Sequence, residues 1–127
     1  MYSATTQGIR VVAQPFYVPS RSSPPAGRFV FAYNIRIENL GGDAAQLLWR
    51  HWYIHDPAGG DSEVEGEGVV GEQPWLRPGD DYTYSSGAVL ATQQGTMRGS
   101  YTMLADDGTR FEAPIPAFVL SVPRTLH

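Results

Sequence analysis

Residues 28–38 read Arg-Phe-Val-Phe-Ala-Tyr-Asn-Ile-Arg-Ile-Glu, and this stretch determines the fold class. Apolar side chains occupy every second position, and the positions between them become more polar toward the end of the stretch. Because successive side chains of a β-strand point to opposite faces, the alternation predicts a long strand with one face in a core. Residues 39–43, Asn-Leu-Gly-Gly-Asp, then predict a turn. The side chains expected to face the core are Phe29, Phe31, Tyr33, Ile35 and Ile37.

The rest of the chain also favours strands over helices. Fourteen glycines and ten prolines in 127 residues interrupt almost every window long enough for a helix. Residues 46–55 are apolar on both faces and predict a central strand. Pro15 indicates an edge or bulge, and Pro114 and Pro116 indicate an exposed or edge strand. The sequence therefore predicts an all-β sandwich of about seven to eight antiparallel strands, connected as a meander or Greek key. The further expected strands are 9–18, 62–66, 82–90, 96–104 and 110–122.

A turn at residues 76–82, Leu-Arg-Pro-Gly-Asp-Asp-Tyr, has the spacing of a tyrosine corner. In this motif the tyrosine hydroxyl bonds back to the backbone of the preceding turn and fixes a crossover between sheets. Proline and glycine form the turn, and the tyrosine combines a large apolar body with one polar tip. We therefore expect the hydroxyl of Tyr82 to fix this corner.

Composition and charge exclude several classes of protein. The absence of cysteine excludes disulfides, thiolate nucleophiles and cysteine-based metal centres. All nine basic residues are scattered arginines against thirteen acidic residues, so no basic stripe for nucleic acid is present. No leader and no run of about 20 apolar residues is visible, so we expect a cytoplasmic protein without membrane insertion. The length predicts one domain over residues 1–127.

The segment Gly66-Glu67-Gly68-Val69-Val70-Gly71 has the G-x-G-x-x-G spacing of dinucleotide sites. Such a loop binds phosphate because it opens a helix inside a βαβ unit. Here Glu67 and Glu72 add two carboxylates, and Pro74 follows closely, so a helix is not expected. The favoured interpretation is a glycine-rich bend between strands, with phosphate binding and partner docking as alternatives.

No catalytic, cofactor or metal residue is predicted. His51 and His55 would share an ion on a helix, but on a strand their rings lie about 13 Å apart. No strained Gly-x-Ser-x-Gly turn is present, and no nucleophile, base and orienting group occur together. Most tryptophans and tyrosines are assigned to the core. Trp75 is the exception, since it lies in a loop where it is either tucked under the bend or open to a partner.

Several long strings in order resemble the ApaG family over residues 8–123. They include Tyr-Asn-Ile-Arg-Ile-Glu-Asn at 33–39, Gln-Leu-Leu-Trp-Arg-His-Trp at 46–52 and Gly-Glu-Gly-Val-Val-Gly-Glu-Gln-Pro at 66–74. Leu-Arg-Pro-Gly at 76–79, Tyr-Ser-Ser-Gly at 84–87, Gly-Thr-Met-Arg-Gly-Ser-Tyr at 95–101 and Ile-Pro-Ala-Phe at 115–118 continue the match. The resemblance implies a fibronectin type III-like, immunoglobulin-like β-sandwich. It also implies a bacterial protein linked to cobalt resistance and magnesium efflux, and it carries no catalytic residues.

These observations lead to a main hypothesis and two alternatives. The main one is a non-enzymatic module that binds a protein partner and supports divalent-cation homeostasis; a homodimer through edge strands is also left open. The first alternative is a sensor that binds a nucleotide polyphosphate or its metal complex at Gly66–Gly71. The second is direct binding of cobalt or magnesium by the acidic turns. The expected partner or ligand surface comprises Gly66, Glu67, Gly68, Gly71, Glu72, Gln73, Pro74, Trp75, Arg50, His51 and Trp52, with Trp75 or Trp52 as its anchor.

Overall fold

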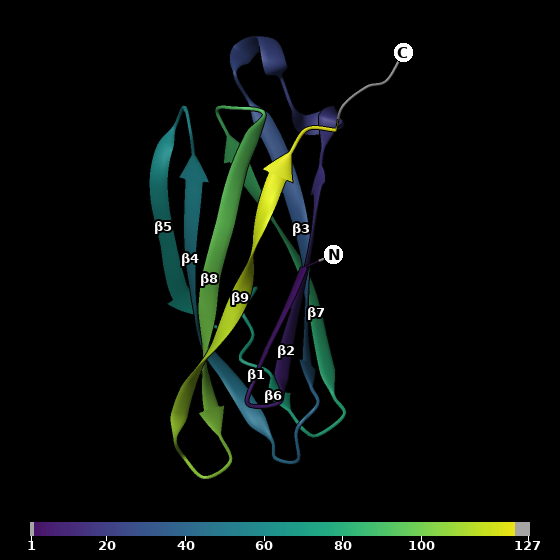
Figure 1. The fold of residues 1–127 in the computed structure, drawn as a ribbon, viewed down its shortest axis with the longest axis vertical. Helices are drawn as coiled ribbons and strands as arrows, with labels where there is room; N and C mark the ends of the chain where they lie inside the picture. Colours follow the sequence, from purple (N-terminus) through teal and green to yellow (C-terminus); the bar gives the residue numbers. More distant parts are fainter. Residues whose placement is uncertain (1, 124–127) are drawn as a thin grey trace.

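Two antiparallel sheets pack face to face in the computed structural model, which describes residues 2–123 (Figure 1). One sheet has the order β1-β2-β3-β7, and the other has the order β5-β4-β8-β9 with the short β6 paired to the start of β4. The strands are β1 Tyr2–Thr6, β2 Ile9–Tyr17, β3 Phe29–Asn39, β4 Ala45–Asp56, β5 Gly60–Glu67, β6 Trp75–Leu76, β7 Asp81–Leu90, β8 Gln94–Ala105 and β9 Arg110–Ser121.

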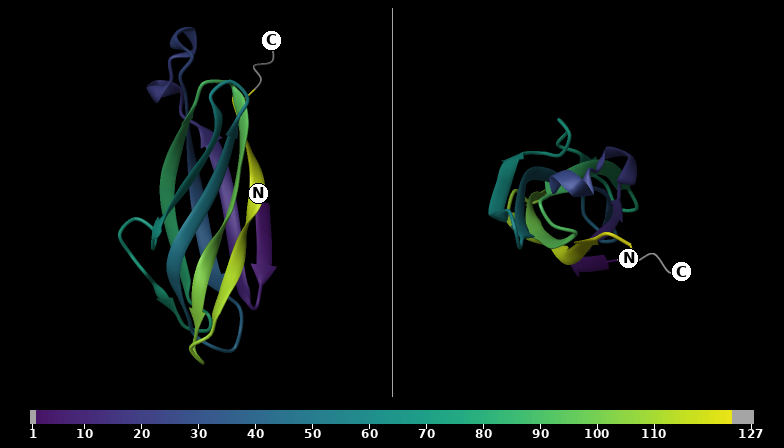
Figure 2. Two further views of the ribbon diagram at one scale, coloured as in Figure 1. Left: turned by 90° about the vertical axis from the view of Figure 1, so that its left-hand side faces the viewer. Right: turned by 90° about the horizontal axis from the view of Figure 1, so that it is seen from above.

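The predicted all-β sandwich is confirmed, and the strands expected from the sequence are all present. The two strands beyond that expectation are β1 and β6. The helical segments among the described residues are the two short turns Pro19–Arg21 and Pro24–Ala26, and neither is long enough to cross a membrane. Seen from above, the sheets curve toward each other, and β9 packs against β1 and β2 on one side (Figure 2).

The core is centred on β3, whose alternation has the predicted phase. Phe31, Tyr33, Ile35 and Ile37 are all buried, and each such burial stabilises the fold by roughly 1.5–3 kcal/mol. An aromatic cluster joins the two sheets. The ring centroid of Trp52 lies 5.2 Å from that of Tyr33 and 5.9 Å from that of Phe118.

A β-bulge interrupts β4 at Leu48. Leu47 is paired with Met103 of β8, but Trp49 is already paired with Thr102, so β4 has one extra residue here. Side-chain direction alternates with period two, and an extra residue therefore reverses which positions face the core. Leu47 is buried before the bulge and Trp52 after it, which leaves the odd-numbered positions 49–55 on the outer face of the sheet.

The prolines lie where the ladder needs no N–H donor. Pro15 is paired with Tyr33 on one side, whereas the pairing of β1 with β2 stops at Ala13. Pro116 lies within a second bulge, between Ile115 and Phe118 of β9. Pro15 therefore lies at a local edge beyond the end of β1, and β9 is the last strand of its sheet, which confirms the edge strand expected from Pro114 and Pro116. The bulge at Pro116 was not expected.

The prediction that the Tyr82 hydroxyl fixes the turn at residues 76–82 is wrong. Among the described residues, the Tyr82 hydroxyl makes no hydrogen bond to the preceding turn. The turn is held instead by the buried Asn39, whose side-chain amide donates to the carbonyl oxygens of Leu76 and Asp43 at 2.9 and 2.8 Å. The Asp80 carboxylate accepts from the Arg77 N–H at 2.9 Å. An amide supplies both donor and acceptor, and it satisfies more buried backbone groups than one hydroxyl could.

Asp56 at the end of β4 is a buried carboxylate that holds the connection between β7 and β8. Its Oδ2 accepts from the Ala91 N–H at 2.7 Å, and its Oδ1 accepts from the Thr92 hydroxyl at 3.0 Å. Burial raises the pKa of Asp56, but hydrogen bonds from Ala91, Gly59, Ala58 and Thr92 outweigh it and hold this pKa below its ordinary value.

Replacing Asp56 by asparagine should lower the free energy of unfolding by about 1–3 kcal/mol at neutral pH, because an amide nitrogen would face N–H donors. The folded-state pKa lies below the unfolded value of about 3.9, so the carboxylate stabilises the fold above that pH. This stabilisation is lost as the pH falls through the folded-state pKa. Urea unfolding of both proteins at about pH 7, 5 and 3 should therefore show the difference shrinking at the lowest pH.

The matched control is Asp107→Asn, since that carboxylate bonds to Thr109 within one exposed hairpin. This control should change stability much less than Asp56→Asn. A difference between wild type and Asp56→Asn that stayed constant at all three pH values would contradict the assignment of an ionised Asp56.

Candidate functional site

The glycine-rich segment forms a loop between β5 and β6 and stands out from the side of the sandwich (Figure 2). It packs against the bulge of β4. The Leu48 carbonyl oxygen accepts from the Gly68 N–H at 2.8 Å and from the Gln73 side-chain amide at 3.0 Å. The Leu47 N–H donates to the Pro74 carbonyl oxygen at 3.0 Å. The loop therefore satisfies backbone groups that the bulge removes from the regular ladder.

Arg50 fastens the start of the loop to β4. Its Nη1 donates to the carbonyl oxygens of Glu67 and Gly68 at 2.9 and 3.1 Å. A Cβ at position 66 would lie only 3.0 Å from the guanidinium, so the glycine there makes room for this contact. Within residues 2–123, Arg50 forms no salt bridge with a carboxylate. The cation is bound by peptide carbonyls, and the glycine at position 66 leaves the guanidinium room to reach them.

The loop lacks the features of a phosphate-binding turn. Val69 and Glu72 exchange two N–H···O hydrogen bonds at 2.8 and 2.9 Å, and the Gly68 N–H is bonded to Leu48. The loop leads into β6 at Trp75–Leu76, so it opens no helix. Phosphate loops bind anions through free N–H groups at a helix N-terminus. The expectation that no helix begins here is confirmed.

The exposed part of the loop combines two large apolar side chains with the polar side chains of Glu67, Glu72 and Gln73. Val70 is 63% exposed and Trp75 is 51% exposed, whereas Val69, which precedes Val70, is fully buried and anchors the loop. Val70 also has a φ of 43°, a left-handed conformation that is strained for a β-branched residue. Trp75 was expected to be either tucked in or open, and the structure shows that it is open to solvent.

Trp52 is not part of this surface, and its assignment as a candidate anchor is wrong. It is only 3% exposed and packs between Tyr33 and Phe118 in the core. The bulge at Leu48 turns Trp52 inward and Trp49 outward. Trp49, which the sequence analysis grouped with the core aromatics, lines an outer groove of about 300 Å³ together with Glu67 and Gln73 of the loop region.

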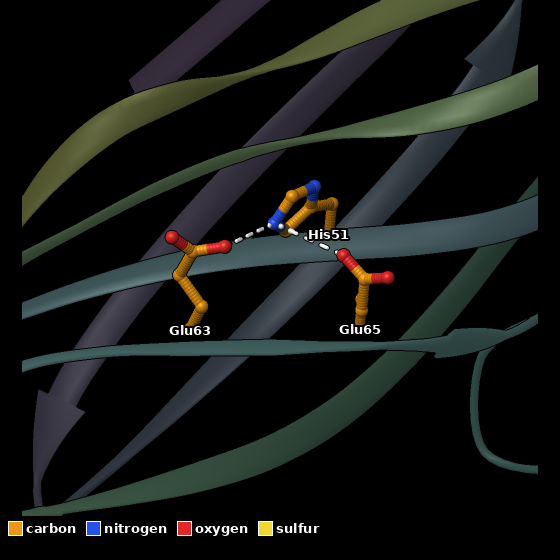
Figure 3. Close-up of side chains that lie close together, drawn as sticks. All are labelled: His51, Glu63 and Glu65. Carbon is orange, nitrogen blue, oxygen red and sulfur yellow. Dashed lines mark hydrogen bonds and ion pairs between the residues drawn. The ribbon is translucent and has the colours of Figure 1, made fainter.

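His51 lies on the outer face of the sheet, beside two carboxylates of β5 (Figure 3). Its Nε2 is 2.9 Å from Glu63 Oε2 and 3.3 Å from Glu65 Oε2. His55 pairs separately with Asp61. The prediction that the two histidines do not share a site is consistent with this pairing, but the sequence analysis missed their carboxylate partners. The sequence contains a signal for these partners. A hairpin turn at 56–60 places His51 opposite Glu65 and His55 opposite Asp61 on the neighbouring strand.

Two tyrosine hydroxyls meet inside the sandwich. Tyr84 and Tyr101 bond to each other from opposite sheets. Burial raises the pKa of both hydroxyls, so both stay protonated at neutral pH. Arg50 and Tyr84 also line an inter-sheet cavity of about 250 Å³ beside the loop. The buried pair satisfies two polar groups between the sheets, and neither hydroxyl is ionised to act as a base.

The comparisons with known proteins agree on one family. The profile of the ApaG domain matches residues 19–105. Protein ApaG of Xanthomonas euvesicatoria pv. vesicatoria (strain 85-10) is 57% identical over 119 residues, which cover 94% of each chain. A crystal structure of an ApaA protein from Bordetella pertussis has a TM-score of 0.89 at 47% identity and covers 92% of this chain and 95% of its own. A second solved structure has a TM-score of 0.86 at 46% identity and covers 94% and 91%.

Substitutions at two loop glycines should separate backbone strain from steric collision. Gly68 and Gly71 both have positive φ, at 59° and 80°. A Cβ at Gly68 would collide with the Glu72 carbonyl oxygen, whereas a Cβ at Gly71 would meet no atom within 4 Å. Gly71→Ala should cost about 1–2 kcal/mol of stability, and Gly68→Ala should cost a further 1–3 kcal/mol or so. Urea unfolding measures both values, and equal costs would contradict the loop geometry.

Proposed function

We propose that this chain, which belongs to the ApaG domain family, is a non-enzymatic module that binds a protein partner through the loop at residues 66–75. One observation carries the proposal. Val70 is held in a strained conformation that leaves most of its side chain in solvent. Strain of this kind costs about 1–3 kcal/mol and persists where the surrounding structure imposes it, commonly at functional sites. A partner that covered Val70 would recover its apolar surface.

The surroundings of Val70 suit a docking surface. Trp75 lies in the same loop and is half exposed, and tryptophan is enriched among residues that dominate binding energy. The loop is held on both sides, by Arg50 at its start and by Gln73 at its end. Because a held loop loses little conformational entropy on binding, its apolar residues are preorganised for a partner.

The other residues predicted for this surface have different roles in the proposal. Gly66, Gly68 and Gly71 allow the backbone path, and Arg50 fastens it. Pro74 accepts a backbone hydrogen bond from Leu47. Glu67 and Gln73 line the groove beside Trp49, and Glu72 adds a carboxylate at the loop. We propose Trp49 in place of Trp52 as the second aromatic side chain of the docking surface.

The link to divalent cations remains part of the proposal and rests on the family resemblance. In this proposal the chain acts on cobalt resistance or magnesium efflux through its partner, without chemistry of its own. The alternative of a nucleotide-polyphosphate sensor receives no support from the loop, whose N–H groups at Gly68, Val69 and Glu72 are bonded within the protein. Glu67 and Glu72 would also repel a polyphosphate.

Val70→Gly and Trp75→Ala should abolish capture of the partner from a cell extract of the host bacterium. Val70→Gly removes the strained side chain, so its stability should equal that of the wild type or exceed it by up to about 1 kcal/mol. Loss of binding without loss of stability would then identify a docking residue. Val89→Ala is the matched control, because Val89 is about as exposed on β7, outside the loop.

The measurement is quantitative mass spectrometry of proteins retained by each immobilised variant. We expect one set of proteins to be retained by wild type and Val89→Ala and lost with both loop variants. Retention of the same proteins by all four would show that the loop is not the docking surface.

A further inference from the structure

Three side chains that suit a metal ion converge on the outer face of the β4–β5 hairpin (Figure 3). His51 comes from β4, and Glu63 and Glu65 come from β5 two positions apart, so both carboxylates lie on one face. One nitrogen of the imidazole and one oxygen of each carboxylate all lie within 4.8 Å of one another. A single ion placed among them would be within reach of all three.

The charges of this group do not balance without a further cation. Within residues 2–123, His51 is the only basic side chain in salt-bridge contact with Glu63 or Glu65. The guanidinium of Arg98, on the neighbouring strand, lies over the ring of Tyr53 at 4.4 Å from its centroid. A protonated imidazole would carry one positive charge against two negative charges. A divalent ion on the neutral imidazole would neutralise both carboxylates.

The imidazole is also oriented in advance. Its ring stacks on Tyr53, with the centroids 4.5 Å apart and the planes at 26°. Tyr53 is itself covered by Arg98. In this orientation Nε2 points toward the carboxylates of β5 (Figure 3). A ligand that is already oriented loses less entropy when it binds an ion.

We propose that His51 Nε2, Glu63 and Glu65 bind one divalent transition-metal ion, with water in the remaining positions. One imidazole and two carboxylates suit zinc, nickel or copper, whereas magnesium and calcium prefer sites made of oxygen alone. The three ligands lie on the strands of the β4–β5 hairpin. The site therefore differs from the binding of cobalt or magnesium by acidic turns that the sequence suggested. It does not depend on the proposed docking of a partner, since it uses neither Val70 nor Trp75.

The hairpin supplies a matched control for this proposal. His55 lies on the same face, four residues further along β4, and pairs with the single carboxylate of Asp61. His51 is partly exposed and His55 is more exposed, and both are next to acid groups, but only His51 completes a set of three ligands. His51→Ala and His55→Ala therefore remove the same chemical group from two settings that differ in ligand number.

The experiment is a titration of the purified protein with zinc chloride, followed by calorimetry and by NMR of the histidine ring nitrogens. We expect one zinc ion per chain in wild type and in His55→Ala, with the largest shift at His51 Nε2. Affinity should fall at least about tenfold in His51→Ala and in the double variant Glu63→Gln, Glu65→Gln. Magnesium added at about ten times the zinc concentration should not displace the zinc.

Three results would overturn the proposal. The first is no binding in wild type, and the second is equal zinc affinity in wild type and His51→Ala. The third is displacement by magnesium, which would indicate an unselective cluster of carboxylates. Neither histidine belongs to the buried core, so thermal unfolding should show both single variants folded, and the comparison between them stays valid.

Discussion

The β-bulge at Leu48 is the constraint on which the functional surfaces of this protein depend. A regular strand would keep the inward phase set by Leu47 and would turn His51 into the core. The extra residue reverses that phase, so Trp52 enters the core and His51 faces solvent. A bulge also leaves backbone groups without ladder partners. Here the glycine-rich loop satisfies the Leu48 carbonyl oxygen through Gly68 and Gln73.

This dependence connects the loop with the hairpin face. Arg50, the second residue after the bulge, fastens the loop, and His51 is the next residue on the opposite side of the sheet. The conformation that presents Val70 to solvent and the conformation that presents His51 to Glu63 and Glu65 therefore share one origin. Two glycines of the G-x-G-x-x-G string are explained by this packing, since Gly66 leaves room for a guanidinium and Gly68 for a peptide carbonyl, whereas Gly71 has open space around it and a positive φ.

The sequence was informative where a pattern was regular and local. Eleven residues of alternation placed β3 and its inward face correctly, and the prolines marked positions without a ladder donor. In residues 46–55 apolar side chains occur at both odd and even positions, so the sequence does not show which face is buried. It therefore could not reveal the bulge or show that Trp52 faces the core. β1 has only five residues, with Tyr2 and Ala4 as its apolar side chains, and an alternation this short does not distinguish a strand. Asn39 was read as part of a turn, because a buried amide that binds residues far along the chain leaves no local signal.

The direction of the side chains on either side of β4 can be measured directly by NMR. In a nuclear Overhauser spectrum of the protein, we expect the indole of Trp52 to contact the rings of Tyr33 and Phe118, whose centroids lie 5.2 and 5.9 Å away. The imidazole of His51 should contact the ring of Tyr53 and the side chains of Glu63 and Glu65. Contacts from His51 to Tyr33 or Phe118 would show that β4 keeps its phase through Leu48, and would contradict the bulge and both surfaces derived from it.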